Sequence, residues 1–173
     1  MHRIALGIAV LAVLGLVTPA AVAASLACPA EKASYAMIGH AEAFSLRLHP
    51  AEIAGANFSE IGVTLKTPQR SYRFALTMSQ GYGGTLLVPL IAGKAPAESL
   101  SSDFVERLRL YAFDDGLAVL ESVPEPGEPA PPYLFLPELG NILWYAPRHL
   151  TDDRHAARDP MPRGVFKLTE CVP

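Results

Sequence analysis

The chain has 173 residues, of which 50% are hydrophobic, and a formal net charge of −3 at pH 7. This slightly acidic balance provides no electrostatic attraction to nucleic acid or to an anionic membrane surface, so we expect neither as a partner. The length is that of a single domain that can bury a proper hydrophobic core.

The N-terminal segment has the three parts of a secretory signal peptide. Met1-His2-Arg3 carries one fixed positive charge, Ile4 to Val17 is an apolar run, and small residues fill positions 20–25. This order predicts a signal peptide of bacterial character over residues 1–24, which is removed on export. We therefore expect a periplasmic or secreted protein.

Export leaves residues 25–173 as the mature chain, which we predict to be a single β-domain. We expect cleavage after Ala23 or Ala24, where small residues suit signal peptidase. An uncleaved membrane anchor is the alternative for this segment, and Pro19 together with the small-residue end argues against it. After cleavage no contact with the membrane is expected.

Two cysteines enclose almost the whole mature domain, Cys28 near its start and Cys171 near its end. An even pair in an exported protein is expected to be oxidised, which predicts a Cys28–Cys171 disulfide. Two free thiols are one alternative. Lipidation of Cys28 is another, but Leu26 lies one position too close to the cysteine for a lipobox. Two cysteines cannot form a structural zinc site alone, and we expect no cofactor.

Apolar and polar residues alternate along most of the mature chain, as they do in half-buried strands. The clearest run is 72–79, where Tyr, Phe, Leu and Met alternate with smaller or polar residues. Asp114-Asp115-Gly116 lies between two such runs and predicts a hairpin. The other predicted strands cover residues 44–49, 61–66, 85–91, 107–113, 117–122, 133–136, 142–145 and 165–169.

These short strands predict an all-β fold, either one antiparallel β-sandwich or a small β-barrel of about eight strands. At most one short helix is expected, from Ser101 or Ser102 to about Leu108. Two long loops interrupt the strands: residues 124–132 have polyproline character, and residues 147–164 are polar. Loops on a rigid β scaffold are the usual place for binding residues.

The charged residues are unevenly distributed along the second half of the chain. No lysine or arginine occurs between Leu110 and Pro147, whereas several acidic residues do. The next stretch, from Arg148 to Lys167, is rich in arginine. We expect one acidic and one basic solvated face, which lie against each other.

The common signatures of exported hydrolases, such as Gly-x-Ser-x-Gly and His-Glu-x-x-His, do not occur in the sequence. An enzyme is therefore the less favoured class. A catalytic triad assembled from distant residues stays open, because such triads are defined by geometry.

One loop gathers residue types that bind metals, namely His149, Asp153 and His155. The spacing of the two histidines fits neither a helix face nor a strand face, so we interpret these residues as solvated loop charges and predict no metal site. The alternative is a small exported hydrolase or metal-assisted enzyme that uses the 149–159 loop, with help from His40 or His49.

The candidate binding residues are mostly aromatic. If 142–145 is a strand, Trp144 and Tyr145 point to opposite faces, and a two-layer fold would cover both, which is the interpretation we favour. An exposed ring beside Arg148 would instead stack on a sugar or a peptide, or form part of a partner interface. Tyr82, in the glycine-rich turn 80–84, is predicted to pack over that turn.

The sequence thus favours a non-enzymatic exported β-domain that binds a ligand or a protein partner, or serves as an accessory of the cell envelope. Its candidate binding residues are Tyr82, Trp144, Tyr145 and Arg148. An inhibitor or protein-interaction module is a further alternative, which predicts an exposed apolar patch around Trp144.

Overall fold

The structure is a computed structural model that describes residues 28–53, 55, 57–78, 84–95, 108–122 and 124–173. The predicted signal peptide, Tyr82 and residues 101–107 of the predicted helix lie outside these residues.

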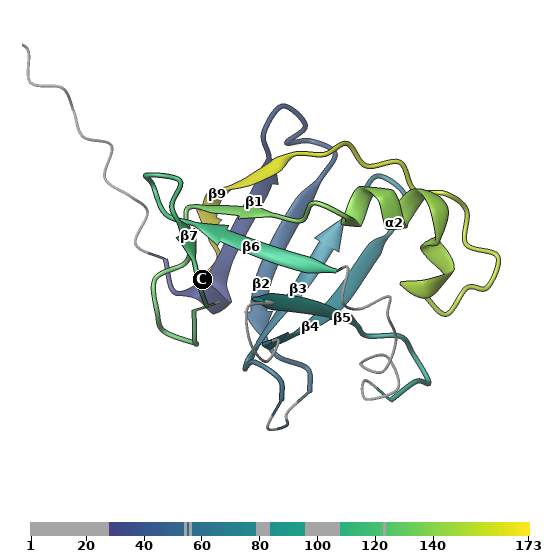
Figure 1. The fold of residues 1–173 in the computed structure, drawn as a ribbon, viewed down its shortest axis with the longest axis horizontal. Helices are drawn as coiled ribbons and strands as arrows, with labels where there is room; N and C mark the ends of the chain where they lie inside the picture. Colours follow the sequence, from purple (N-terminus) through teal and green to yellow (C-terminus); the bar gives the residue numbers. More distant parts are fainter. Residues whose placement is uncertain (1–27, 54, 56, 79–83, 96–107, 123) are drawn as a thin grey trace, which may run out of the picture.

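Within the described residues, nine antiparallel strands form one sheet (Figure 1). They are β1 (Ala33–Met37), β2 (Ser45–Pro50), β3 (Ile61–Lys66), β4 (Ser71–Met78), β5 (Thr85–Pro89), β6 (Arg109–Phe113), β7 (Val119–Leu120), β8 (Tyr133–Phe135) and β9 (Val165–Cys171). A short α-helix, α2 (Leu139–Tyr145), and two 3-10 turns, η1 (Ala30–Lys32) and η3 (Pro147–His149), complete the elements described.

Eight of these strands close into a barrel. Strands β1 to β6 pair in chain order, β6 then pairs with β8, β8 with β9, and β9 with β1. The extra strand β7 pairs with the end of β6, on the edge where β5 pairs with the beginning of β6. The all-β prediction is confirmed, and the architecture is the small barrel.

The barrel interior is occupied by side chains. An eight-stranded barrel is just wide enough to be filled by side chains or to hold one small ligand. Here the inward positions are the apolar members of the predicted alternation. The largest side chains among them are fully buried: Tyr35, Tyr72, Phe74 and Phe166.

Strand β5 is buried on both faces, which explains why its sequence is apolar without interruption from Leu86 to Pro89. Leu87 belongs to the barrel core. The opposite face of β4 and β5 is covered by the loop between β2 and β3, in a second apolar cluster that contains Ala75, Leu86 and Val88 beneath Ile53 and Phe58.

The two ends of the barrel carry different structures. The helix end carries α2 and the turns 38–44 and 67–70, and the buried side of α2 joins the barrel core (Figure 1). The disulfide end carries η1, the loop 51–60 and the connections 114–132. Among the described residues, no helix is long and apolar enough to cross a membrane.

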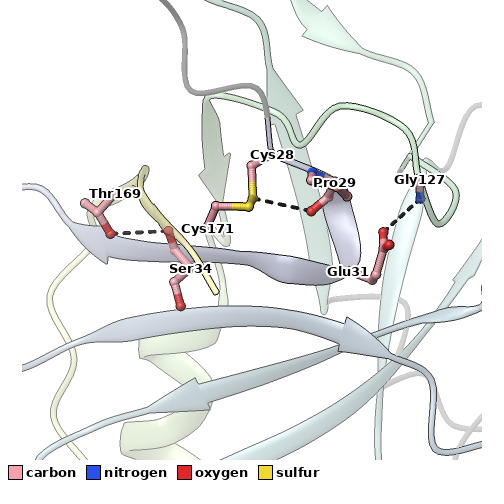
Figure 2. The surroundings of a disulfide bond; sticks show 7 residues. All are labelled: Cys28, Pro29, Glu31, Ser34, Gly127, Thr169 and Cys171. Atoms are coloured by element: carbon pink, nitrogen blue, oxygen red, sulfur yellow. Dashed lines mark hydrogen bonds between the residues drawn. A yellow bond between two sulfur atoms is a disulfide. The ribbon is translucent and has the colours of Figure 1, made fainter. Parts of the chain in front are cut away.

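The predicted disulfide is present and lies where the first and last strands meet (Figure 2). Cys28 and Cys171 have their Cα atoms 5.5 Å apart, and Ala33 of β1 is paired with Cys171 of β9. The register shifts between Ser34 and Tyr35, which leaves Thr169 as the extra residue of a bulge. The Thr169 hydroxyl donates to the Ser34 carbonyl at 3.2 Å. The seam of the barrel is therefore both hydrogen-bonded and covalently linked.

The strand predicted at 142–145 is wrong, because these residues form most of α2. Leu139, Ile142 and Leu143 follow helical spacing and bury one side of α2. A short apolar run does not distinguish a buried strand from a buried helix by periodicity. Trp144 and Tyr145 therefore do not lie on opposite faces of a sheet, and both are exposed.

Most of the acidic and basic stretches do not lie against each other as predicted. The acidic residues 114–128 belong to the disulfide end, whereas Glu138 and the basic residues 148–163 belong to the helix end, because β8 crosses the barrel between residues 128 and 138. An ion pair on the outer face of β4 joins Arg73 and Glu52 at 2.7 Å.

Candidate functional site

The exposed side of α2 is the most distinctive surface of the helix end. Trp144 and Tyr145 are adjacent on this helix, and their exposed fractions are 37% and 74%. Most of the helix is buried, so the backbone that carries the two rings is fixed to the barrel. Large exposed aromatic side chains on a rigid element are typical of binding surfaces.

The segment Arg158–Pro162 runs beside α2. The Asp159 amide donates to the Leu143 carbonyl at 3.1 Å. The segment also approaches Gly140 so closely that a Cβ atom there would lie 2.5 Å from the Met161 carbonyl oxygen. Glycine at position 140 is thus what allows the segment to pack against the helix.

A shallow hollow lies between α2 and this segment. It has a volume of about 340 Å³ and is lined by Gly140, Trp144, Pro160, Met161 and Pro162. The guanidinium of Arg158 lies over the Trp144 ring, 5.0 Å from its centroid, which is the geometry of a cation–π contact. We call Trp144, Tyr145, Arg158 and the hollow the α2 surface.

A buried carboxylate fixes the segment to the barrel. Asp159 is 0% exposed, and its Oδ2 accepts hydrogen bonds from the Thr67 hydroxyl at 2.7 Å and the Tyr72 hydroxyl at 2.9 Å. Its Oδ1 has no hydrogen-bond partner among the described residues. Thr67 belongs to the β3–β4 turn and Tyr72 to β4, so Asp159 joins the loop to the opposite wall of the barrel.

Four arginines lie on η3 and on the loop that follows α2. Arg148, Arg154, Arg158 and Arg163 are all exposed, and none of them has an ion-pair partner within the described part of the chain. The acidic residues of the same loop are engaged locally: Asp152 accepts from the Thr151 hydroxyl, and Asp153 accepts from the His155 amide at 2.8 Å. A partner with negative charge would therefore find unpaired guanidinium groups here.

The structure brings together some of the predicted binding residues. Trp144 and Tyr145 are adjacent on the surface, and Arg148 is exposed in η3, directly after α2. The cation over the indole is Arg158 and not Arg148. Tyr82 lies outside the described residues.

Sequence reasoning missed the roles of Asp159 and of the Pro160–Pro162 wall of the hollow. Asp159 was visible only as one more carboxylate of a polar loop. Its partners, Thr67 and Tyr72, are more than 80 positions away along the chain. The Pro-x-Pro sequence after Asp159 was the one local signal that this part of the loop is stiff.

The loop of His149, Asp153 and His155 does not gather its side chains around a common point. The Asp153 carboxylate caps the backbone of its own turn through the His155 amide. Across the described residues, no three His, Cys, Asp or Glu side chains are arranged so that they could hold one metal ion.

Two buried tyrosines predict how stability depends on alkaline pH. Burial raises the pKa of Tyr35. The pKa of Tyr72 is raised mainly by burial and further by the hydrogen bond to Asp159. The folded protein then keeps these protons at a pH where the unfolded chain loses them, above about pH 10. Below that pH the two protonated tyrosines make their full contribution to the free energy of unfolding. Above it, the free energy of unfolding is expected to fall by up to about 1.4 kcal/mol per pH unit for each tyrosine.

Urea unfolding between about pH 9 and pH 11 checks this prediction, since the interval spans the ordinary tyrosine pKa. The Tyr35 hydroxyl has no partner among the described residues, so Tyr35→Phe should lower the alkaline slope with little loss of stability at pH 7. An unchanged slope in Tyr35→Phe would contradict the role given to this group.

Comparison of the chain with protein-family models, with curated protein sequences and with solved structures gave no significant match.

Proposed function

We propose that this protein is an exported, non-enzymatic β-barrel domain, periplasmic or secreted, that binds a protein partner through its α2 surface. The observation that carries the proposal is the exposure of Trp144 and Tyr145 side by side on a helix fixed to the barrel. The predicted signal peptide and the disulfide between Cys28 and Cys171 support the export.

The α2 surface suits an extended acidic segment that contains proline. Aromatic-lined grooves are the usual docking sites of proline-rich segments, whose extended conformation is largely preformed. The hollow beside Trp144 is shallow and apolar, which fits a pyrrolidine ring. Arg158 supplies positive charge for the carboxylates of such a segment, and the exposed Arg148 and Arg163 flank α2 and the hollow in the sequence.

The α2 surface is preformed in the absence of a partner. Asp159 anchors one wall of the hollow to the barrel, and α2 forms the other wall. A rigid site loses little conformational entropy on binding, which supports recognition by a small surface.

The single tryptophan of the chain provides a direct test, because all tryptophan fluorescence comes from position 144. A synthetic peptide of alternating glutamate and proline is titrated into the full-length mature protein. We expect a saturable change in the emission of Trp144. The affinity for the peptide obtained from this titration should fall at least tenfold in Arg158→Ala and in Tyr145→Ala. Added salt should lower the affinity as well, since the contact is partly electrostatic.

Matched controls separate recognition from general effects. A peptide of equal charge in which serine replaces each proline tests the need for proline. Val119→Ala removes another exposed apolar side chain at the disulfide end and should bind as the wild type does. If none of the peptides alters the Trp144 emission, the proposed function is wrong.

A further inference from the structure

The disulfide end carries a segment with the chemistry that the α2 surface is proposed to bind. Residues 125–129 read Glu-Pro-Gly-Glu-Pro, and all of them are exposed. The Glu128 amide donates to the Glu125 carbonyl at 3.1 Å, and Gly127 has φ of 85°, as a turn with Pro126 and Gly127 at its centre requires. We call this turn the acidic apex.

The acidic apex is held in one conformation by the rest of the barrel. The Glu31 carboxylate accepts a hydrogen bond from the Gly127 amide at 2.8 Å (Figure 2), and this bond lowers the pKa of Glu31. The Ala30 amide donates to the Glu128 carbonyl at 2.9 Å, and the Ala130 amide donates to the Cys28 carbonyl at 2.7 Å. The disulfide at Cys28 therefore braces the base of the apex, whose two prolines are presented to solvent.

The electrostatics of the two ends are complementary. The connections 114–132 at the disulfide end carry Asp114, Asp115, Glu121, Glu125 and Glu128 and no basic residue. The helix end carries the exposed arginines Arg148, Arg154, Arg158 and Arg163, without ion pairs in the described part of the chain, together with the acidic residues Glu138, Asp152 and Asp153. Opposite ends of one molecule thus carry an acidic proline turn and an aromatic hollow with the Arg158 guanidinium over its indole.

We propose that the occupant of the α2 surface is the acidic apex of a second copy of this chain. This inference rests on the proposed function and names its partner. Pro126 or Pro129 of one molecule would pack against Trp144 of the next, while Glu125 would face Arg158. Each copy uses a different end for each neighbour, so the contact is head to tail.

The position of the two surfaces determines the form of the assembly. Surfaces at opposite ends of a barrel do not meet in a closed pair, so association continues into chains, or into larger rings where the rotation between neighbours closes. The contact area of one turn in one shallow hollow is small, which predicts weak, reversible association that depends on concentration and on salt.

Two variants, each lacking one of the two surfaces, test the proposal. Glu125→Lys/Pro126→Ser removes the apex and keeps the α2 surface, whereas Trp144→Ala removes the α2 surface and keeps the apex. Arg158→Glu serves as a second variant of the α2 surface in case Trp144→Ala folds poorly. Sedimentation velocity measures the association of each protein, and circular dichroism checks that each is folded.

We expect the wild type to form larger species as its concentration rises, and each variant alone to remain a monomer. Mixing the two variants should give a one-to-one complex and no longer chains, because only one contact can form. In that mixture all tryptophan emission comes from Glu125→Lys/Pro126→Ser, which keeps Trp144. This emission should change as Trp144→Ala is added. Salt should dissociate the complex.

Two other outcomes would overturn the proposal. A wild type that remains monomeric, together with an unresponsive mixture, excludes the second copy as partner; if glutamate–proline peptides still alter Trp144 emission, the proposed function survives with a different partner. Association that persists in both variants would show that the copies meet through another surface.

Discussion

Replacing both Cys28 and Cys171 with alanine is expected to lower the free energy of unfolding by about 5 kcal/mol. The bond joins positions 143 residues apart, so the unfolded chain gains the freedom of nearly the whole domain when the bond is removed. Loss of this magnitude is a large fraction of the stability of an ordinary domain. The variant should therefore be only marginally folded at 37 °C.

Urea unfolding followed by circular dichroism measures the effect. The oxidised wild type is compared with the double alanine variant and with wild type treated with a reducing agent, and the last two should agree. Thr169→Val is the matched control, because it removes a hydrogen bond at the same seam and should cost only about 1 kcal/mol. If the double variant loses no more than this control does, the disulfide is not a major source of stability.

Asp159→Ala is expected to destabilise the protein by about 2 kcal/mol, since it leaves one buried hydroxyl group without an acceptor and leaves another with only the Arg70 carbonyl at 3.1 Å. The hydroxyls belong to Thr67 and Tyr72, both of which are buried. Asp159→Asn keeps one oxygen that can accept both bonds, so its effect should be nearer 1 kcal/mol. The same unfolding experiment gives these values, and a double-mutant cycle with Tyr72→Phe isolates the Tyr72–Asp159 bond.

Asp152→Ala provides the comparison for this site, because Asp152 lies on the same loop but is exposed. Its effect should remain within about 0.5 kcal/mol. The Asp159 variants should also alter the emission of Trp144 in the folded protein, because Arg158 precedes the anchoring residue and lies over the indole. Equal stability of Asp159→Ala and Asp152→Ala would contradict the anchoring role.

The barrel strands were largely predictable because they alternate. In β2 and in the first half of β4 one face meets the core and the other is largely exposed, so the pattern of Leu46 or Phe74 with its neighbours is a direct record of the fold. Strand β1 was missed because Ala33 and Ala36 give it a weak contrast between its faces. The choice of barrel over sandwich depends on the pairing of β1 with β9, which no local pattern specifies.

The α2 surface was predictable only in part. The aromatic pair and a nearby arginine are visible as residue types, but their exposure depends on whether residues 139–145 form a helix or a strand. That choice is made by the way Leu139, Ile142 and Leu143 fill the open end of the barrel. The anchoring of Asp159 by Thr67 and Tyr72 is a tertiary contact across the barrel, and sequence patterning carries no information on such contacts.

The pairing of the first strand with the last also has a consequence for the order of assembly. The pairs from β1 to β6 join strands that are consecutive in the sequence, whereas β1 and β9 come from the two ends of the domain. Contacts of such long sequence separation form late. The loss of chain entropy on closing the loop between the two strands becomes smaller only once the intervening hairpins have formed. One edge of β1 therefore remains unpaired until β9 is in place. Joining of Cys28 to Cys171 then marks the completion of the barrel.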